Sequence, residues 1–250
     1  MTDEFSREIK LFDSDGTLLK SFNPDNMLSR PYSVCVTHKD KIIIGDKGSE
    51  GIFVFNSHFD FLTHFGKGIK SSTTYLFADT NNSSLIYSTH CADNNFLCWN
   101  IDEEQVVSQL KLDKPEYIFA KYDKIYVSSA TMFESVDSKK TSNVKIKSGS
   151  NCIYIIDRYT MAVERTIVFE NWLQPSGLYV DDEETIFTTA YRWDANHIKS
   201  ESKYLHVINK NGDIERKICL NGVKNFDDMI IKSNRIIFYV WQAIKIIEFL

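Results

Sequence analysis

The chain has 250 residues, of which 43% are hydrophobic and 25% are charged, a composition typical of a globular protein and not of a disordered one. Its formal net charge of −5 disfavours a domain devoted to nucleic acid, because such domains usually carry a basic surplus. The first ten residues, MTDEFSREIK, contain no apolar leader, and no apolar run has the length of a transmembrane helix. We therefore expect a cytoplasmic protein that binds neither membrane nor DNA.

The predicted elements are short strands that recur in a fixed order. Two strand-like segments, residues 8–13 and 17–23, come first and are joined by the turn Ser14-Asp15-Gly16. Four apolar runs follow, separated by turns: strand A at 32–37, strand B at 41–46, strand C at 51–56 and strand D at 61–65. The same cycle returns over 74–111, 116–169 and 176–219, and residues 227–249 supply a last cycle without strand D.

The spacing of these cycles predicts the fold. The cycles begin near Pro31, Thr73, Pro115, Pro175 and Asn225, at intervals of about 42, 42, 60 and 50 residues. Four strands in each period of 40 to 50 residues are typical of β-propeller blades, whereas a β-sandwich would not repeat one strand order so often. We predict an all-β fold, a single β-propeller domain over residues 1–250. The number of predicted strands is compatible with either five or six blades.

The ends of the chain suggest how the ring closes. The last strand, Ala243–Phe249, is rich in isoleucine and would be an aggregation-prone edge if it were left unpaired. The two N-terminal strands have no neighbours in sequence to pack on except each other, and an isolated hairpin is only marginally stable. We predict that at least one N-terminal strand pairs with the C-terminal blade.

Residues 30–66 resemble the NHL repeat, a family of propeller blades. The matching pieces are the entry to strand A at 30–34, the strand B exit Ile43-Ile44-Gly45-Asp46, the turn residues Gly48-Ser49, the end of strand C at 54–56 and a final Phe65-Gly66. Residues 11–16 and 174–178 look like parts of further blades. The sequence departs from the family at the start of strand C, where Gly51 stands in place of the usual arginine, and His90 replaces the strand B aspartate in the second cycle.

Loop lengths indicate which face of the propeller binds. The A–B and C–D turns are minimal, whereas two B–C loops are long and run from Thr131 to Asn151 and from Tyr191 to Lys203. Both loops are net positive and lie close to aromatic residues, which are common anchors of interfaces. The predicted binding residues are Phe133, Lys139, Lys140, Lys145, Lys147, Tyr191, Arg192, Trp193, His197 and Trp241. The alternatives are that the lysines are only solvated and that the aromatics pack within the fold.

The sequence contains no motif for catalysis. It has no G-x-S-x-G, no H-E-x-x-H, no phosphate-binding glycine pattern and no close cysteine or histidine pairs of a metal site. The cysteines at 35, 91, 98, 152 and 219 are scattered, and we expect buried, reduced thiols. The chain also resembles gluconolactonase-like propellers in blade layout. The acidic and amide residues that could hold their cation are Glu116, Asn225, Asp227 and Asp228, but they do not align with that ligand set.

These observations favour a non-enzymatic scaffold that binds a protein partner, with no catalytic residue, metal or cofactor. Two other functions stay open. The resemblance to NHL repeats implies that single-stranded RNA is a second candidate ligand, since aromatic residues beside lysine and arginine suit base stacking. The resemblance to lactonases implies a metal-dependent hydrolase with its site in the central channel.

Overall fold

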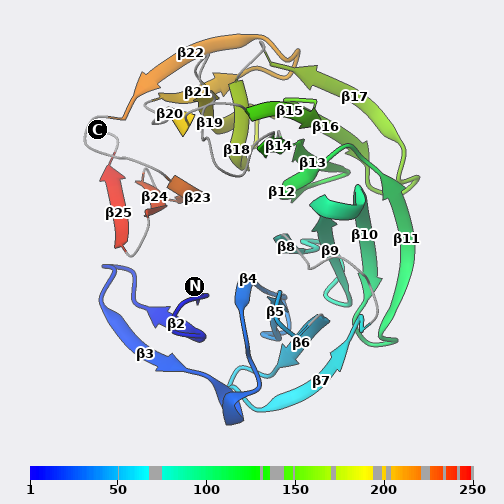
Figure 1. The fold of residues 1–250 in the computed structure, drawn as a ribbon, viewed down its shortest axis with the longest axis vertical. Helices are drawn as coiled ribbons and strands as arrows, with labels where there is room; N and C mark the ends of the chain where they lie inside the picture. The colour runs from blue at the N-terminus through cyan, green and yellow to red at the C-terminus, as the bar shows by residue number, and fades with distance from the viewer. Residues whose placement is uncertain are drawn as a thin grey trace. The chain divides into compact units, whose positions relative to one another are not determined.

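The structure is a computed structural model, and it shows an all-β fold, a β-propeller built of four-stranded antiparallel blades, as predicted (Figure 1). It describes residues 1–49, 51–67, 75–129, 132–135, 144–148, 150–169, 173–193, 199–200, 204–220, 226–232, 235–240 and 243–248. Contacts divide the chain into two compact units, residues 1–123 with 159–161 and residues 124–158 with 162–250, and each is described by itself. Among the described residues, no helix combines the length and hydropathy needed to cross a membrane.

The first unit contains the first twelve strands. Their bounds are β1 (Thr2–Asp3), β2 (Glu8–Phe12), β3 (Leu18–Phe22), β4 (Pro31–Val36), β5 (Ile42–Asp46), β6 (Gly51–Phe55), β7 (Phe61–Phe65), β8 (Tyr75–Ala78), β9 (Leu85–His90), β10 (Asn95–Asn100), β11 (Gln105–Lys111) and β12 (Pro115–Lys121). Two short 3-10 helices, η1 (Pro24–Asn26) and η2 (Cys91–Asp93), interrupt the series. The sheets have the orders β1-β2-β3, β4-β5-β6-β7 and β8-β9-β10-β11. The last two are the first two predicted cycles.

The second unit contains the remaining strands. Their bounds are β13 (Lys124–Ser129), β14 (Met132–Ser135), β15 (Val144–Ser148), β16 (Cys152–Asp157), β17 (Val163–Val168), β18 (Leu173–Val180), β19 (Ile186–Trp193), β20 (Lys199–Ser200), β21 (Tyr204–Ile208), β22 (Ile214–Cys219), β23 (Phe226–Lys232), β24 (Arg235–Val240) and β25 (Ala243–Glu248). Within this unit the sheet orders are β13-β16-β17, β18-β19-β21-β22 and β23-β24-β25. Consecutive blade strands of each predicted cycle therefore pair in chain order, with each strand beside the next.

Side-chain oxygens of Asp and Asn residues hold the short turns closed. Asn56 Oδ1 accepts hydrogen bonds from the backbone N–H groups of His58 and Asp60, both at 2.9 Å. Asn209 does the same for Asn211 at 2.9 Å and Asp213 at 3.0 Å. These are Asx turns, in which the side chain replaces a backbone acceptor and fixes a tight reversal. They explain why the C–D connections can be as short as the sequence predicts.

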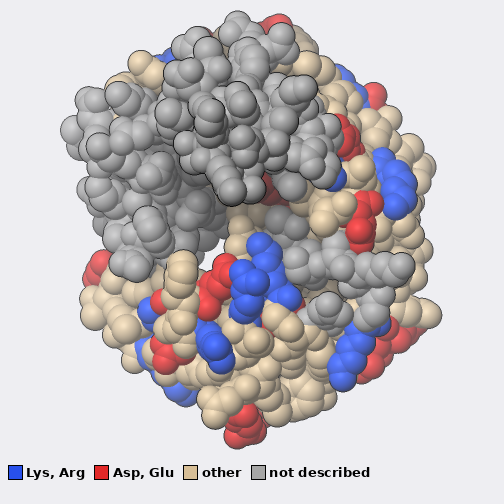
Figure 2. All heavy atoms as spheres, viewed as in Figure 1, with Lys and Arg blue, Asp and Glu red and all other residues tan. Residues whose placement is uncertain are grey.

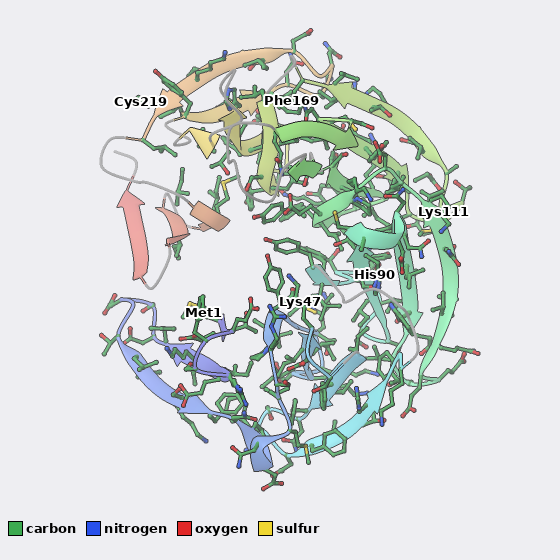
Figure 3. All side chains as sticks on the ribbon, in the orientation of Figure 1. Met1, Lys47, His90, Lys111, Phe169 and Cys219 are labelled. Atoms are coloured by element: carbon green, nitrogen blue, oxygen red, sulfur yellow. The ribbon has the colours of Figure 1, made fainter. Side chains whose placement is uncertain are left out.

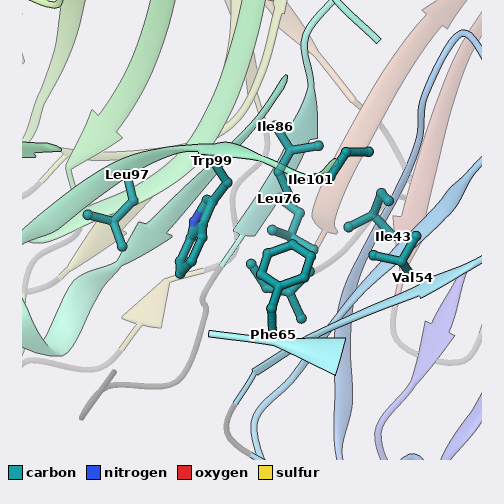
Figure 4. Close-up of a cluster of buried hydrophobic side chains, with 9 residues drawn as sticks. Ile43, Val54, Phe65, Leu76, Ile86, Leu97, Trp99 and Ile101 are labelled. Carbon is teal, nitrogen blue, oxygen red and sulfur yellow. The ribbon is translucent and has the colours of Figure 1, made fainter. Parts of the chain in front are cut away.

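The core of the first unit lies between neighbouring sheets. One buried cluster joins Ile43, Val54 and Phe65 of the β4–β7 sheet to Ile86 and Trp99 of the β8–β11 sheet (Figure 4). Trp99 Nε1 donates a hydrogen bond to Ser88 Oγ at 2.8 Å, so the one polar atom of this large ring is satisfied in the core. Packing between sheets therefore supplies the burial that a single four-stranded sheet lacks.

The N-terminal strands pack differently from the prediction. Ile9 of β2 is buried in a cluster with Leu28, Ile44, Phe53 and Phe55, and Thr2 Oγ1 donates a hydrogen bond to Tyr32 O at 2.8 Å. The expectation that these strands have only each other to pack on is wrong, because the adjacent β4–β7 sheet offers an apolar face. In the sheet orders β2 lies between β1 and β3, and β25 lies beside β24. Closure of a ring by pairing of the two chain ends stays a prediction.

The two long B–C connections carry strands of their own. β14 and β15 pair as an antiparallel hairpin between strands B and C of the third cycle, with Glu134 opposite Lys145. In the fourth cycle β19 extends to Trp193 and pairs with the two-residue strand β20. These segments were predicted as loops, because short runs such as MFES and VKIKS lack the apolar content of the blade strands.

His206 makes the stability of the second unit depend on pH. The ring lies on β21 opposite Thr188 and Lys217, and only 3% of the residue is exposed. Burial, and to a lesser extent Lys217, lowers the pKa of His206 from 6.5 to about 4. The unfolded chain therefore takes up the proton first as pH falls. We expect the free energy of unfolding to decrease between about pH 6.5 and pH 4, by about 2 to 3 kcal/mol in total.

Urea unfolding of the wild type and of His206→Gln at pH 7.5 and pH 4.5 measures this effect. The His206→Gln variant should lose less stability on acidification than the wild type. His58→Gln, at an exposed histidine, is the matched control and should behave like the wild type. Equal acid sensitivity in all three proteins would show that His206 does not carry the pH dependence.

Candidate functional site

The best-defined candidate site lies in the first unit, where the first strands of three consecutive sheets begin. Strand β4 lies against β8, and β8 against β12. Ser33 Oγ accepts a hydrogen bond from Leu76 N at 2.9 Å, and Thr89 Oγ1 donates one to Glu116 O at 2.6 Å. These bonds connect one sheet to the next and hold the starts of the three strands in fixed positions.

Three tyrosines form a continuous row at this end of the strands. The ring centroids of Tyr32 and Tyr75 lie 5.9 Å apart in an edge-to-face arrangement, and those of Tyr75 and Tyr117 lie 4.0 Å apart. Further along the same strands, Phe77 and Phe119 are in contact at 5.4 Å. Tyr32 and Tyr75 are half-buried, whereas Tyr117 is buried. The tyrosine row therefore presents rigid aromatic edges beside a second pair of packed rings.

Asp46 organises the backbone beside the tyrosine row. Its carboxylate is completely buried and accepts four backbone N–H hydrogen bonds, from Ser29 and Arg30 through one oxygen and from Gly48 and Ser49 through the other. These bonds are 2.7 to 2.9 Å long. Lys47 N also donates to Arg30 O at 2.9 Å. The strand B aspartate identified from the sequence thus ties the D–A loop to the B–C turn.

Lys47 projects from this turn onto the tyrosine row (Figure 3). Its Nζ lies 2.9 Å from the ring centroid of Tyr32, a cation–π contact. Burial is the largest cause that lowers the pKa of Lys47, from 10.5 to about 8, and the charge of Arg30 adds to it. The carboxylates of Glu4 and Glu116 act in the opposite direction. Lys47 is therefore a partly desolvated cation at the edge of an aromatic surface.

Charged side chains of both signs surround Lys47. Arg30 forms an ion pair with Glu4, in which Arg30 Nε donates to Glu4 Oε1 at 2.8 Å. Lys114 Nζ donates to Cys91 O at 3.3 Å, which places a second lysine next to η2. In Figure 2 basic and acidic groups likewise lie beside each other on the described surface. The surface around the tyrosine row is therefore mixed in charge and not a basic stripe.

The cysteine of this region is not activated as a nucleophile. Burial raises the pKa of the Cys91 thiol to about 11, and the charge of Glu116 adds to the effect. A nucleophilic cysteine requires the thiolate, which is scarce at neutral pH under these conditions. None of the five cysteines forms a disulfide, and Cys98 and Cys152 are buried as expected, whereas Cys35 and Cys91 are half-buried and Cys219 is exposed.

The second unit contains a polar hollow of about 220 Å³ at the A–B and C–D turn end of its strands. Lys124, Arg165 and Lys210 line it together with Glu164 and Glu184, over a floor that includes Ile155 and Ile186. Lys124 forms an ion pair with Glu184 at 3.3 Å. The hollow has charges of both signs and contains none of the residues predicted to bind.

The predicted binding residues belong to other segments. Phe133 lies on β14, opposite Ile146, and Lys145 and Lys147 lie on β15. Tyr191, Arg192 and Trp193 end β19, where Tyr191 is opposite Gln174 and Arg192 opposite Leu173. Lys139, Lys140, His197 and Trp241 lie outside the described residues. All the predicted residues belong to the second unit, and their role in binding stays a prediction.

The candidate cation ligands are separated in the chain. Glu116 is half-buried on β12, Asp227 and Asp228 lie on β23, and Asn225 lies outside the described residues. Across the described ranges, no three His, Cys, Asp or Glu side chains are close enough to hold a metal ion together.

Sequence reasoning missed the tyrosine row, although the signal was present. Tyr32, Tyr75 and Tyr117 recur near the start of strand A in the first three cycles. A residue that repeats at one blade position comes next to its equivalents in neighbouring blades, so the repeat itself predicts a row of rings. Lys47 had no such signal, because its position over Tyr32 depends on the turn that Asp46 holds.

No protein-family description matches the sequence, and no curated protein is detectably similar to it.

Proposed function

We propose that this protein is a non-enzymatic propeller scaffold that binds a protein partner at the end of the blades where the B–C and D–A connections lie. The observation that carries the proposal is the tyrosine row with Lys47 and Arg30 at its edge. Tyrosine and arginine are the residue types that most often supply binding energy at protein interfaces, because they combine large contact area with strong polar interactions.

The rigidity of this surface supports a binding role. The strands that carry the rings are joined by hydrogen bonds between the sheets, and the turn that carries Lys47 is fixed by Asp46. A surface that is ordered before binding loses little conformational entropy when the partner arrives.

A capture experiment with matched variants tests this proposal. The wild type, Tyr75→Ala and Tyr159→Ala are immobilised at equal density and exposed to an extract of the native cells. Tyr159 is 76% exposed in a turn between strands C and D, away from the tyrosine row. We expect a partner retained by the wild type and by Tyr159→Ala but reduced at least tenfold by Tyr75→Ala, the loss of a hot spot worth about 1.4 kcal/mol or more.

A partner set that is the same for all three proteins would contradict the use of the tyrosine row. A further variant that lacks residues 136–143 tests the predicted loop residues Lys139 and Lys140 in the same experiment. Thermal unfolding of each variant shows whether a lost partner reflects a lost contact or a lost fold.

Single-stranded RNA is a second candidate ligand, because the half-buried rings of Tyr32 and Tyr75 beside Lys47 resemble a stacking platform for bases. Glu4 and Glu116 oppose it, since their charges repel phosphates. An electrophoretic shift assay with oligouridine from low to high salt decides between the two. Binding that is lost on Tyr75→Ala and weakens steeply with salt would favour RNA, and no shift at low salt would end this alternative.

A further inference from the structure

Lys47 carries a positive charge that nothing in its described surroundings neutralises by direct contact. Within the described part of the protein its Nζ has neither an ion pair nor a hydrogen bond, and its one close partner is the ring of Tyr32. Moving an ammonium group out of water is costly unless an opposite charge or several acceptors replace the water. A cation held in this way has capacity for an anionic ligand.

The nearby carboxylates do not fill this role. Glu4 is engaged by Arg30, which holds Glu4 Oε1 through both Nε and a terminal nitrogen. Glu116 acts on Lys47 only through its charge, and Arg30 repels the ammonium group. Burial therefore outweighs these attractions, which is why the pKa of Lys47 is lowered to about 8.

The surroundings also select among ligands. A cationic ligand would meet Lys47 and Arg30, and a doubly charged phosphate would meet Glu4 and Glu116. A carboxylate has one negative charge and a flat shape that can lie against Tyr32 and Tyr75 while it accepts from Lys47. A single carboxylate is thus the anion with the smallest electrostatic conflict at this position.

We propose that Lys47 and the tyrosine row form a subsite for a carboxylate group that the partner presents, either an Asp or Glu side chain or a peptide C-terminus. This proposal rests on the proposed function and specifies the chemistry of the partner. The carboxylate would pair with the ammonium group of Lys47 from the side opposite the Tyr32 ring, while the neighbouring partner residues lie on Tyr75.

Short peptides of defined charge test the subsite directly. The lysines are reductively methylated with a ¹³C label, and the Lys47 resonance is assigned by its absence in Lys47→Gln. Acetyl-Gly-Asp-Gly-amide should shift this resonance saturably, whereas acetyl-Gly-Asn-Gly-amide should not. Acetyl-Gly-Gly with a free C-terminus, compared with its amide, shows whether a terminal carboxylate is taken instead. The proposal is overturned if the Asp and Asn peptides give equal shifts and both Gly-Gly peptides do so too. It is also overturned if inorganic phosphate or tetramethylammonium gives a larger shift than the peptides.

The pH dependence gives a second readout. Binding of a carboxylate needs the protonated ammonium group, so affinity falls as pH rises through the pKa of Lys47, which is about 8. We expect affinity for the favoured peptide to be roughly tenfold lower at pH 9 than at pH 7, because Lys47 passes from about nine-tenths protonated to about one-tenth over that range. An affinity that is constant over this range would contradict a role for Lys47.

The capture experiment separates this proposal from the proposed function. Lys47→Gln should reduce capture of the partner at least tenfold, whereas Lys41→Gln, at a lysine on the opposite turn, should leave it unchanged. If Tyr75→Ala abolishes capture and Lys47→Gln does not, the carboxylate subsite is wrong and the binding face stands. If neither changes capture but the Asp peptide still shifts Lys47, the subsite stands and the proposed partner face is wrong.

Discussion

Replacement of Asp46 by alanine is expected to lower the free energy of unfolding by about 4 kcal/mol, one of the largest effects of any single change in this protein. The carboxylate of Asp46 is completely buried and accepts four backbone N–H groups. Alanine leaves these donors without an acceptor, and an unsatisfied buried donor costs about 1 to 3 kcal/mol. Water that enters the site can satisfy some of the four donors, so the expected loss is smaller than the sum of four such costs.

Two variants provide the comparison for Asp46. Asp46→Asn keeps one acceptor oxygen but turns an amide nitrogen toward two of the donors. We therefore expect this variant to be less stable than the wild type and more stable than Asp46→Ala. Asp13→Ala removes an acceptor of the Asp15 and Thr17 N–H groups in an exposed turn and should cost much less. Equal losses for Asp46→Ala and Asp13→Ala in urea unfolding would contradict the account of Asp46 as a buried clamp.

The same residue also links the fold to the proposed site. Asp46 fixes the turn that contains Lys47 and the loop that contains Arg30. Asp46→Asn is therefore expected to weaken binding at the tyrosine row even at temperatures where the protein stays folded. Asp46, which the sequence matches to the strand B exit of the NHL repeat, would then act as a positioning residue for the binding face.

The order of the strands within the blades could be predicted from the sequence, because it follows from local patterns of residues. Strands such as 42–46 and 51–55 are dense in β-branched and aromatic residues, and Asx turns mark the reversals between strands. Antiparallel neighbours joined by short turns leave little freedom in pairing, so each strand pairs with the next one along the chain. The segments at 132–135 and 144–148 were missed as strands because they pair with each other outside the blade and have no apolar periodicity.

The site was harder to predict because it combines residues that are far apart in the sequence. Loop length and nearby aromatic residues favoured the two long B–C connections, whereas the tyrosine row consists of residues within regular strands. Tyr32, Tyr75 and Tyr117 become a surface only when three sheets lie side by side. The position and pKa of Lys47 likewise depend on loop residues such as Arg30, which no local pattern relates to residue 47.

Deletion of residues 1–24 is expected to cause aggregation or a large loss of thermal stability. Ile9 of β2 covers the apolar side chains of Leu28, Ile44, Phe53 and Phe55, which would otherwise face water. The deletion also removes the hydrogen bond from Thr2 to Tyr32. Size-exclusion chromatography and thermal unfolding of the truncated protein measure both outcomes, and a monomer with an unchanged melting temperature would contradict the prediction.

A point substitution separates the two reasons for this loss. If packing of β2 on the β4–β7 sheet is the cause, Ile9→Ala should lower the free energy of unfolding by about 3 kcal/mol, the usual cost of emptying a buried isoleucine site. Leu19→Ala, at a position on β3 that is 60% exposed, should cost less than about 0.5 kcal/mol. If instead the N-terminal strands act mainly by closing a ring with the C-terminal blade, their effect comes from backbone pairing at a strand edge. Ile9→Ala would then cost little, and Leu19→Pro on β3 would destabilise the protein far more than Leu19→Ala.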